Sequence, residues 1–217
     1  MKKVLIAIPC MDLVPAQFAN SLAQMTSYGI EDTMVSTRFN IGSLIYSSRN
    51  QLASNALEDG ADYVLWLDSD MVFNPTTLLL LLKDIEEGAD FVTGVYYRRT
   101  APFSPVIFKE LEIDEKNRAT WEDYNEFPED GLFEVAGCGF GCVLMKTEIF
   151  REVYLKFGHM FSPIGDVGED LSFCYRARKC GYTLLCDPSI PLGHVAHTMV
   201  TKEFYINYTN AKGKGQG

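Results

Sequence analysis

Two aspartates follow a short apolar run, in Asp68-Ser69-Asp70 directly after Tyr63–Leu67. Five apolar residues in a row are typical of a buried strand, and open α/β sheets bind ligands just beyond the carboxyl ends of their strands. Two carboxylates at such a point can bind one hard divalent cation through their oxygens. The tripeptide also suits a plain strand-end turn, because Asp and Ser favour turns and can cap a following helix.

A second acidic pair, Glu169-Asp170, opens a segment with helical spacing and several basic residues near its end. Acids in the first turn and bases in the last complement the helix dipole, which gives the pair a purely structural explanation. A carboxylate at a helix start can also face the crevice at a sheet end. There it can accept a proton from a hydroxyl.

Other candidate residues are cationic or can bind metals. His194 and His197 lie three residues apart, and a neutral imidazole is a common ligand for metals such as Mn²⁺. In an extended segment the two rings need not point the same way, so the role of His197 is open. Arg49 and Asn50 precede the acidic strand end and are either solvated helix residues or part of the same site.

The overall charge narrows the choice of ligand. The chain has 217 residues, a net charge of −10 and a pI near 4.8, which argues against nucleic acid or an anionic membrane as a partner. An acidic protein repels a phosphorylated ligand unless a cation lies between them. The composition therefore favours a phosphate bridged by a metal over a phosphate held in a basic cradle.

The elements that position these residues alternate between strands and helices. The alternation predicts an α/β fold, a mostly parallel central sheet with helices on both faces. We expect strands at Val4–Ile8, Thr33–Thr37, Tyr63–Leu67, Ala89–Tyr97 and Thr183–Cys186, and helices at Val14–Ser27, Ser43–Glu58, Pro75–Glu87, Thr147–Phe157 and Gly168–Cys180. Leu44, Ser48, Leu52 and Leu57 are the expected inward face of the second helix.

Two segments interrupt the alternation. Residues 98–131 hold prolines and many charges and are expected to form an insertion that acts as a lid. Trp121 and Tyr124 within it either stack on a sugar or anchor the insertion. Leu132–Lys146 is expected to be a strand whose glycines allow close approach of another group. We expect residues 1–206 to form one domain and 207–217 to be a flexible tail.

These motifs, in this order, resemble the GT-A-type glycosyltransferases that use nucleotide sugars, particularly family 2-like members. The matching segments are Val4–Pro9, Ser48-Arg49-Asn50, Leu67–Asp70, the glycine-bearing strand at 136–144, Glu169-Asp170 with Arg176, and a late histidine. The resemblance implies a single-domain, Rossmann-like GT-A fold. It also implies a DxD motif that holds a metal bound to the donor diphosphate.

The resemblance gives each residue an expected role. Pro9 and Cys10 would lie by the nucleotide base, with Arg49 and Asn50 also beside the nucleotide. Asp68, Ser69 and Asp70 would bind the sugar nucleotide, and Asp68, Asp70 and His194 would bind Mn²⁺ or Mg²⁺. Asp170 would be the general base that deprotonates the acceptor, and Glu169 would orient the acceptor.

We therefore predict a metal-dependent glycosyltransferase that transfers one sugar from a UDP- or GDP-sugar to a hydroxyl, with inversion. A retaining course, a nucleotidyltransferase and an inactive carbohydrate-binding module remain alternatives. The acceptor is open between a carbohydrate, a lipid-linked molecule and a protein. No apolar run is long enough to span a membrane, and the six cysteines lack zinc-site spacing, so a cytoplasmic location with reduced thiols is expected.

Overall fold

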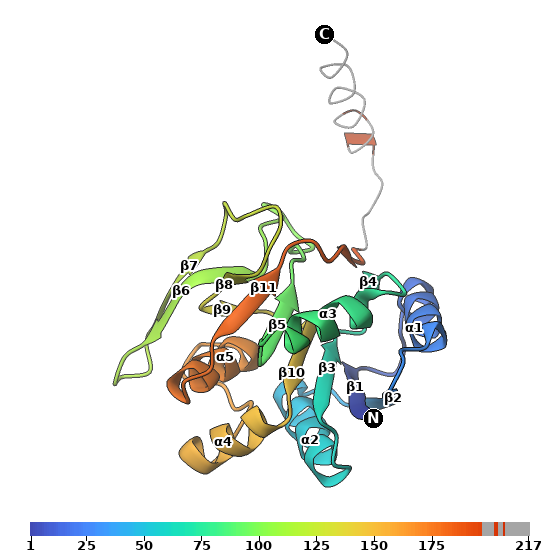
Figure 1. The fold of residues 1–217 in the computed structure, drawn as a ribbon. Coiled ribbons are helices and arrows are strands. Elements are labelled where there is room, and N and C mark those ends of the chain that lie inside the picture. Colours follow the sequence, from blue (N-terminus) through green and yellow to red (C-terminus); the bar gives the residue numbers. More distant parts are fainter. Residues whose placement is uncertain (197–201, 204–205, 207–217) are drawn as a thin grey trace.

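The computed structural model describes residues 1–196, 202–203 and 206; His197 and the expected tail at 207–217 lie outside the described residues. The centre of the described part is a seven-stranded sheet (Figure 1). Its strands, in spatial order, are β2 (Thr33–Ile41), β1 (Lys2–Cys10), β3 (Tyr63–Leu67), β10 (Cys142–Lys146), β5 (Phe91–Gly94), β11 (Leu184–Asp187) and β8 (Phe133–Glu134).

The sheet is mixed but mostly parallel, which confirms the predicted fold class. β1 pairs in parallel with both β2 and β3, and β5 pairs in parallel with β11. β10 runs antiparallel between β3 and β5, and β8 runs antiparallel on β11. All five parallel strands therefore end at the same edge of the sheet, where a ligand crevice is expected.

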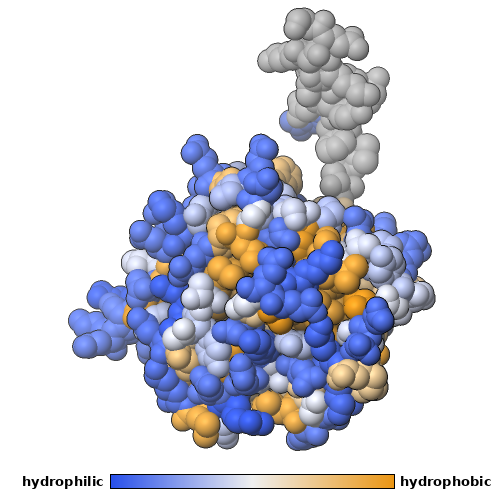
Figure 2. Space-filling model, viewed as in Figure 1, coloured by the Kyte–Doolittle hydropathy of each residue, from blue (hydrophilic) through white to orange (hydrophobic). Residues whose placement is uncertain are grey.

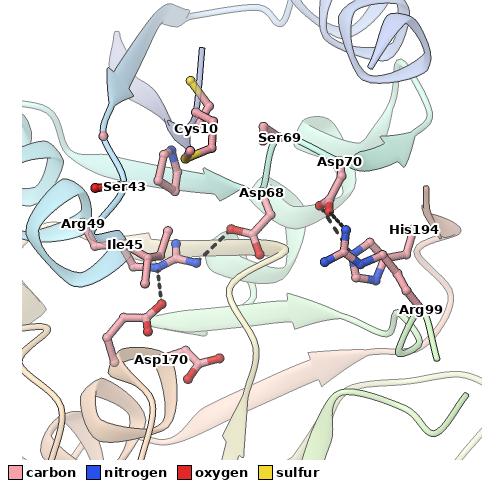
Figure 3. Close-up of a pocket in the computed structure, with 14 residues that line it drawn as sticks. Cys10, Ser43, Ile45, Arg49, Asp68, Ser69, Asp70, Arg99, Asp170 and His194 are labelled. Carbon is pink, nitrogen blue, oxygen red and sulfur yellow. Dashed lines mark hydrogen bonds and ion pairs between the residues drawn. The ribbon is translucent and has the colours of Figure 1, made fainter. Parts of the chain in front are cut away.

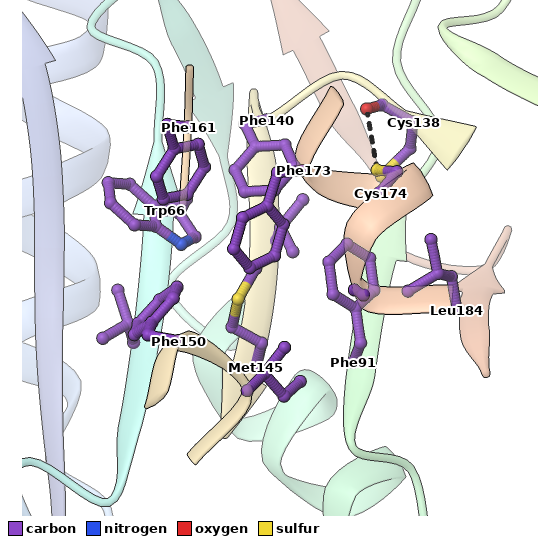
Figure 4. Packing of buried hydrophobic residues seen from close by; sticks show 14 of the residues in the cluster. Trp66, Phe91, Cys138, Phe140, Met145, Phe150, Phe161, Phe173, Cys174 and Leu184 are labelled. Atoms are coloured by element: carbon purple, nitrogen blue, oxygen red, sulfur yellow. Dashed lines mark hydrogen bonds between the residues drawn. The ribbon is translucent and has the colours of Figure 1, made fainter. Parts of the chain in front are cut away.

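Helices cover both faces of the sheet. α1 (Ala16–Tyr28) and α3 (Thr77–Glu86) pack on one face, and α2 (Ile45–Glu58), α4 (Glu148–Phe157) and α5 (Glu169–Lys179) pack on the other. The second face is aromatic, as Figure 4 shows around Trp66 and Phe140. Phe161 and Phe173 stack there with ring centroids 4.4 Å apart. This packing fixes the start of α5, and with it Glu169 and Asp170, against the end of β3.

The inward face of α2 differs from the prediction. Ser48 and Leu52 are buried as expected, but Leu44 is exposed and Arg49 is buried instead. A charged side chain replaces an apolar one on this face because two carboxylates from other elements meet it there. The apolar spacing of α2 carries no sign of those distant partners.

The glycine-bearing segment is not one strand. It divides into β8, the short β9 (Gly137–Cys138) and β10, which belong to two different sheets. A Cβ atom at Gly139 would lie 2.1 Å from the hydroxyl oxygen of Tyr96, and one at Gly141 would lie 2.7 Å from its ring. The glycines therefore admit the Tyr96 side chain, which is the close approach that the sequence predicted.

Part of the 98–131 insertion is a β-hairpin of β6 (Ile107–Ile113) and β7 (Ala119–Asp123). β6 also pairs with β9, which joins the hairpin to the body of the protein. Tyr124 packs against the core, with its ring centroid 5.2 Å from that of Phe133, so it anchors the insertion. Trp121 is 55% exposed, so the anchoring explanation does not account for it.

A small second sheet pairs β4 (Met71–Phe73) with β12 (Leu192–His194) in antiparallel register. Strands this short carry no recognisable sequence pattern, and neither was predicted. The pairing places His194 opposite Met71, directly after the acidic turn.

The surface is hydrophilic over most of the face in Figure 2, with apolar residues gathered in its upper middle part. Among the described residues, no helix is both long enough and apolar enough to cross a membrane.

Candidate active site

A cavity of about 370 Å³ lies beyond the carboxyl ends of β1 and β3 (Figure 3). It brings together nearly all of the residues predicted for the site: Pro9, Cys10, Arg49, Asp68, Ser69, Asp70, Glu169, Asp170 and His194. Asn50 does not line it. The Asn50 amide accepts a hydrogen bond from the Phe161 backbone N–H at 3.1 Å and donates one to the Tyr46 carbonyl at 2.9 Å.

Arg49 joins the two acidic motifs. Its Nη2 donates to Oδ1 of Asp68 at 2.8 Å, and its Nε donates to Oε1 of Glu169 at 3.1 Å. Only 3% of the Arg49 side chain is exposed, and its guanidinium carbon lies 5.1 Å from the Phe140 ring centroid. Burial acts to lower the pKa of Arg49, but the charges of Asp68 and Glu169 more than offset this, and the net shift is upward. Arg49 is therefore a fixed cation between two elements that are distant in sequence.

Asp70 and His194 lie side by side in the lining of the cavity. Asp68-Ser69-Asp70 forms the turn between β3 and β4, and Oδ1 of Asp70 lies 3.4 Å from Nε2 of His194. The His194 Nδ1 contacts the Tyr97 carbonyl oxygen at 2.9 Å. A carbonyl can only accept, so Nδ1 is a donor in this contact, which leaves Nε2 as the ring nitrogen that could bind a cation placed between it and Asp70.

This arrangement fits a divalent cation that takes most of its ligands from elsewhere. In the described part of the chain, no group of three or more His, Cys, Asp or Glu side chains could hold a metal by itself. Mg²⁺ is commonly bound through one or two protein groups, with substrate phosphates and water as the rest. Asp70 and His194 offer an oxygen and a nitrogen of suitable chemistry, whereas Oδ1 of Asp68 is already paired with Arg49.

Asp170 is the acid best suited to exchange a proton near neutral pH. Burial raises the pKa of its carboxyl to about 6, and the neighbouring Glu169 adds to the rise. Its Oδ1 accepts a hydrogen bond from the Leu171 backbone N–H at 2.8 Å, which holds the carboxyl in place. A group with this pKa can accept a proton at neutral pH and release it again.

Alanine at position 168 is expected to impair Asp170 without unfolding the protein. A Cβ at Gly168 would lie 2.9 Å from Oδ1 of Asp170, too close for the carboxyl to keep its place. The φ of Gly168 is −56°, so alanine adds no backbone strain. We expect Gly168→Ala to lower the rate of any reaction in which Asp170 exchanges a proton by about tenfold or more, because small misplacements of reacting groups have large effects. Its melting temperature should match that of the wild type; a wild-type rate would contradict this packing argument.

Arg99 was missed by the sequence analysis. Its Nη1 donates to Oδ2 of Asp70 at 2.7 Å, whereas His194 lies nearest to Oδ1 of the same carboxylate (Figure 3). The residue belongs to the start of the insertion, where many charges occur and none stands out. One feature of the sequence could have marked Arg99 as a site residue: the pair Arg98-Arg99 follows soon after the buried strand β5.

Comparison with known proteins decides the family. Residues 34–154, more than half of the chain, match the model of glycosyl transferase family 2. The chain belongs to this family. The match favours a glycosyltransferase over a nucleotidyltransferase, and family 2 glycosyltransferases act with a nucleotide-sugar donor, an acceptor and generally a divalent metal.

The fold of this family 2 glycosyltransferase, a GT-A fold, is similar to that of a solved structure, the crystal structure of A197 from STIV. The TM-score is 0.61 at 20% sequence identity, over 91% of this chain and 87% of that chain. At this identity the likeness concerns the fold alone. A search of curated proteins found no match.

Proposed function

We propose that this family 2 glycosyltransferase is metal-dependent and transfers a single sugar from a UDP- or GDP-sugar to an acceptor hydroxyl, with inversion. One observation carries the proposal. The two acidic motifs and His194, which lie far apart in sequence, line one cavity, and Arg49 links the two motifs. A catalytic site requires such side chains to meet in one place. A structural turn or a helix cap does not require it.

The proposed reaction is a direct displacement. The acceptor oxygen attacks the anomeric carbon, its bond to the diphosphate oxygen breaks, and the electron pair leaves with the diphosphate. Asp170 accepts the proton of the attacking hydroxyl. Glu169, which Arg49 holds through Nε, lies beside it and orients the acceptor. Because the buried carboxyl of Asp170 has a pKa of about 6, it is ionised and ready to accept that proton above neutral pH.

The donor diphosphate would lie at the Asp70 side of the cavity. Asp70 and His194 would hold Mn²⁺ or Mg²⁺, with Asp68 nearer to the sugar or ribose. The cation, when bound, neutralises the charge that develops on the leaving diphosphate. Arg99 adds a second positive charge there, since its guanidinium holds the far oxygen of Asp70. Pro9 and Cys10 line the end of the cavity suited to the nucleotide base.

Alanine at position 70 is the direct test of the metal site. We expect Asp70→Ala to weaken Mn²⁺-dependent binding of nucleoside diphosphates by about 100-fold, because loss of even an outer partner weakens metal binding 10- to 100-fold. Isothermal titration with UDP and GDP, with and without Mn²⁺, measures this. Asp59→Ala, which removes an exposed ion pair with Arg38, is the control and should bind like the wild type.

Equal Mn²⁺-dependent binding by Asp70→Ala and the wild type would exclude Asp70 as a metal ligand. A thermal-shift panel of nucleotide sugars, followed by product analysis, would identify the donor. Binding of a donor without any turnover would indicate a carbohydrate-binding module instead of an enzyme. The cytoplasmic location expected from reduced cysteines stays a prediction.

A further inference from the structure

A second cavity of about 260 Å³ opens on the other side of Asp170, between the β6–β7 hairpin and the start of α5. Of the described residues, Asp170 alone lines both this cavity and the larger one. A base that takes the proton of an attacking hydroxyl is expected to lie where the two substrates meet. The geometry therefore separates a donor side, with Asp70 and His194, from a second side that the proposed donor does not occupy.

The lining of this second cavity is of two kinds. Phe108, Val167 and Leu171 form an apolar wall, and Trp121 adds an indole ring from the hairpin. Arg98, Asp166 and Asp170 supply hydrogen-bond donors and acceptors around it. An apolar surface with a few convergent polar groups is the usual make-up of a small-molecule site.

The exposure of Trp121 has no structural explanation within the described residues. It is 55% exposed on the hairpin, whereas Tyr124, just after β7, is partly buried against the core. Aromatic rings that stay open beside polar groups are well suited to bind amphipathic ligands. A sugar ring is such a ligand, because its C–H face can stack on an indole while its hydroxyls bond to charged groups at the edge.

Two adjacent arginines, Arg98 and Arg99, line different cavities. Arg99 turns to Asp70 on the donor side. Arg98 lines the second cavity, where its Nε donates to Oγ of Ser104 at 3.1 Å and its guanidinium carbon lies 5.9 Å from the Phe108 ring centroid. The start of the insertion thus contributes one cation to each side. Arg98 is fixed before any ligand binds, so it presents a prearranged donor.

We propose that this second cavity is the acceptor subsite, that it takes a sugar ring, and that Trp121 stacks on that ring. The inference rests on the proposed function and specifies its acceptor as a carbohydrate. The volume lies below the range of about 300 to 1,000 Å³ that holds drug-sized ligands, which suits a single ring. A lipid chain would place apolar carbons against Arg98 and Asp166, whereas sugar hydroxyls bond to both.

Fluorescence tests the binding directly. The chain has two tryptophans, and Trp66 is fully buried, so quenching by acrylamide reports on Trp121. We expect at least one methyl glycoside, from a panel of methyl hexosides and methyl N-acetylhexosaminides, to protect Trp121 from acrylamide. Lack of protection by every glycoside, or protection by an aliphatic alcohol or a serine peptide alone, would overturn the sugar assignment.

Kinetics test the role in transfer. We expect Trp121→Ala to raise the KM for the protecting glycoside by about tenfold, which corresponds to about 1.4 kcal/mol and lies within the range of an aromatic contact. Hydrolysis of the donor without acceptor should be unchanged, and Trp121→Phe should recover most of the affinity. Tyr154→Ala removes an aromatic residue that is also 55% exposed, on α4, and serves as the control.

An unchanged KM in Trp121→Ala would refute the subsite. Failure of the proposed function looks different: no nucleotide sugar would be bound or hydrolysed, whatever the residue at position 121. Glycoside protection of Trp121 is measured without a donor, so it tests the sugar site even in that case.

Discussion

Asparagine in place of Asp170 is expected to abolish most sugar transfer and, at the same time, to make the folded protein more stable above neutral pH. The loss of the base should lower kcat by about 100- to 10,000-fold, the usual contribution of general base catalysis. Donor binding should be unchanged, since the contacts proposed for the donor diphosphate are those of Asp70 and His194 and do not include Asp170. The amide oxygen of the substituted side chain can still accept the hydrogen bond from the Leu171 backbone N–H, so the local structure is kept.

The gain in stability follows from the raised pKa of Asp170, about 6 against an ordinary value of 3.8. Below pH 4 the carboxyl is protonated in both states, and it contributes nothing. Between pH 4 and 6 the unfolded chain releases this proton while the folded protein keeps it, so stability falls as pH rises. Above pH 6 the full penalty of burying the charge is present. We expect Asp170→Asn to raise the free energy of unfolding at pH 8 by about 1 to 3 kcal/mol.

A matched control separates the two effects. Burial also raises the pKa of Asp84, on α3, to about 6, and Asp84 lies outside both cavities. Asp84→Asn should stabilise the protein at pH 8 and leave kcat unchanged. The wild-type kcat should rise with pH, reach half of its maximum near pH 6 and level off above about pH 7. Normal turnover by Asp170→Asn would show that another group is the base, or that the enzyme retains configuration.

Methionine in place of Arg49 is expected to destabilise the fold and the site together. Removing one partner of a buried ion pair typically lowers stability by about 3 to 5 kcal/mol, because the other charges stay buried without compensation. Here Asp68, Glu169 and Asp170 would face one another with no buried cation between them. Urea unfolding measures the loss, and sugar transfer should fall with it as the two acidic motifs separate.

Lysine at position 49 shows whether the charge alone is enough. An ammonium group is a compact charge and lacks the planar fork that reaches Asp68 and Glu169 in two directions. We expect Arg49→Lys to recover part of the stability and little of the activity. Arg38→Met, which removes an exposed pair with Asp59, should change stability by less than about 1 kcal/mol. Full activity of Arg49→Lys would mean that the fork geometry is unimportant.

Most of the residues selected from the sequence line one cavity, but the contacts that hold this cavity together were not predicted. Apolar runs and helix signals located the strand ends and the start of α5, and residue types there suggested carboxylate and imidazole chemistry. These are local properties, and the structure brings the residues into one cavity. Arg49 shows the limit. It lies 120 residues from Glu169, and nothing near it in the chain distinguishes a buried cation from a solvated one.

Local sequence patterns also could not predict the direction of a strand or the presence of very short strands. β10 has the same apolar character as β3 and β5, yet it runs antiparallel to both, because alternation along the chain does not record direction. β4 and β12 have three residues each, too few for any periodicity. Arg99 was not selected, since charged residues are common throughout the insertion and its place soon after β5 is a weak signal. Each of these misses depends on contacts between segments far apart in sequence.

The pairing of β4 with β12 has a consequence for how the protein matures. During synthesis, the first three strands to emerge are β1, β2 and β3, and they can pair early. Asp68 and Asp70 follow β3 directly, so they are present at that stage. His194 reaches Asp70 only when β12 has left the ribosome and docked on β4, more than a hundred residues later. A nascent chain therefore carries the acidic turn for most of its synthesis without the imidazole that faces it in the folded protein. Catalytic competence should appear as one of the last events of folding.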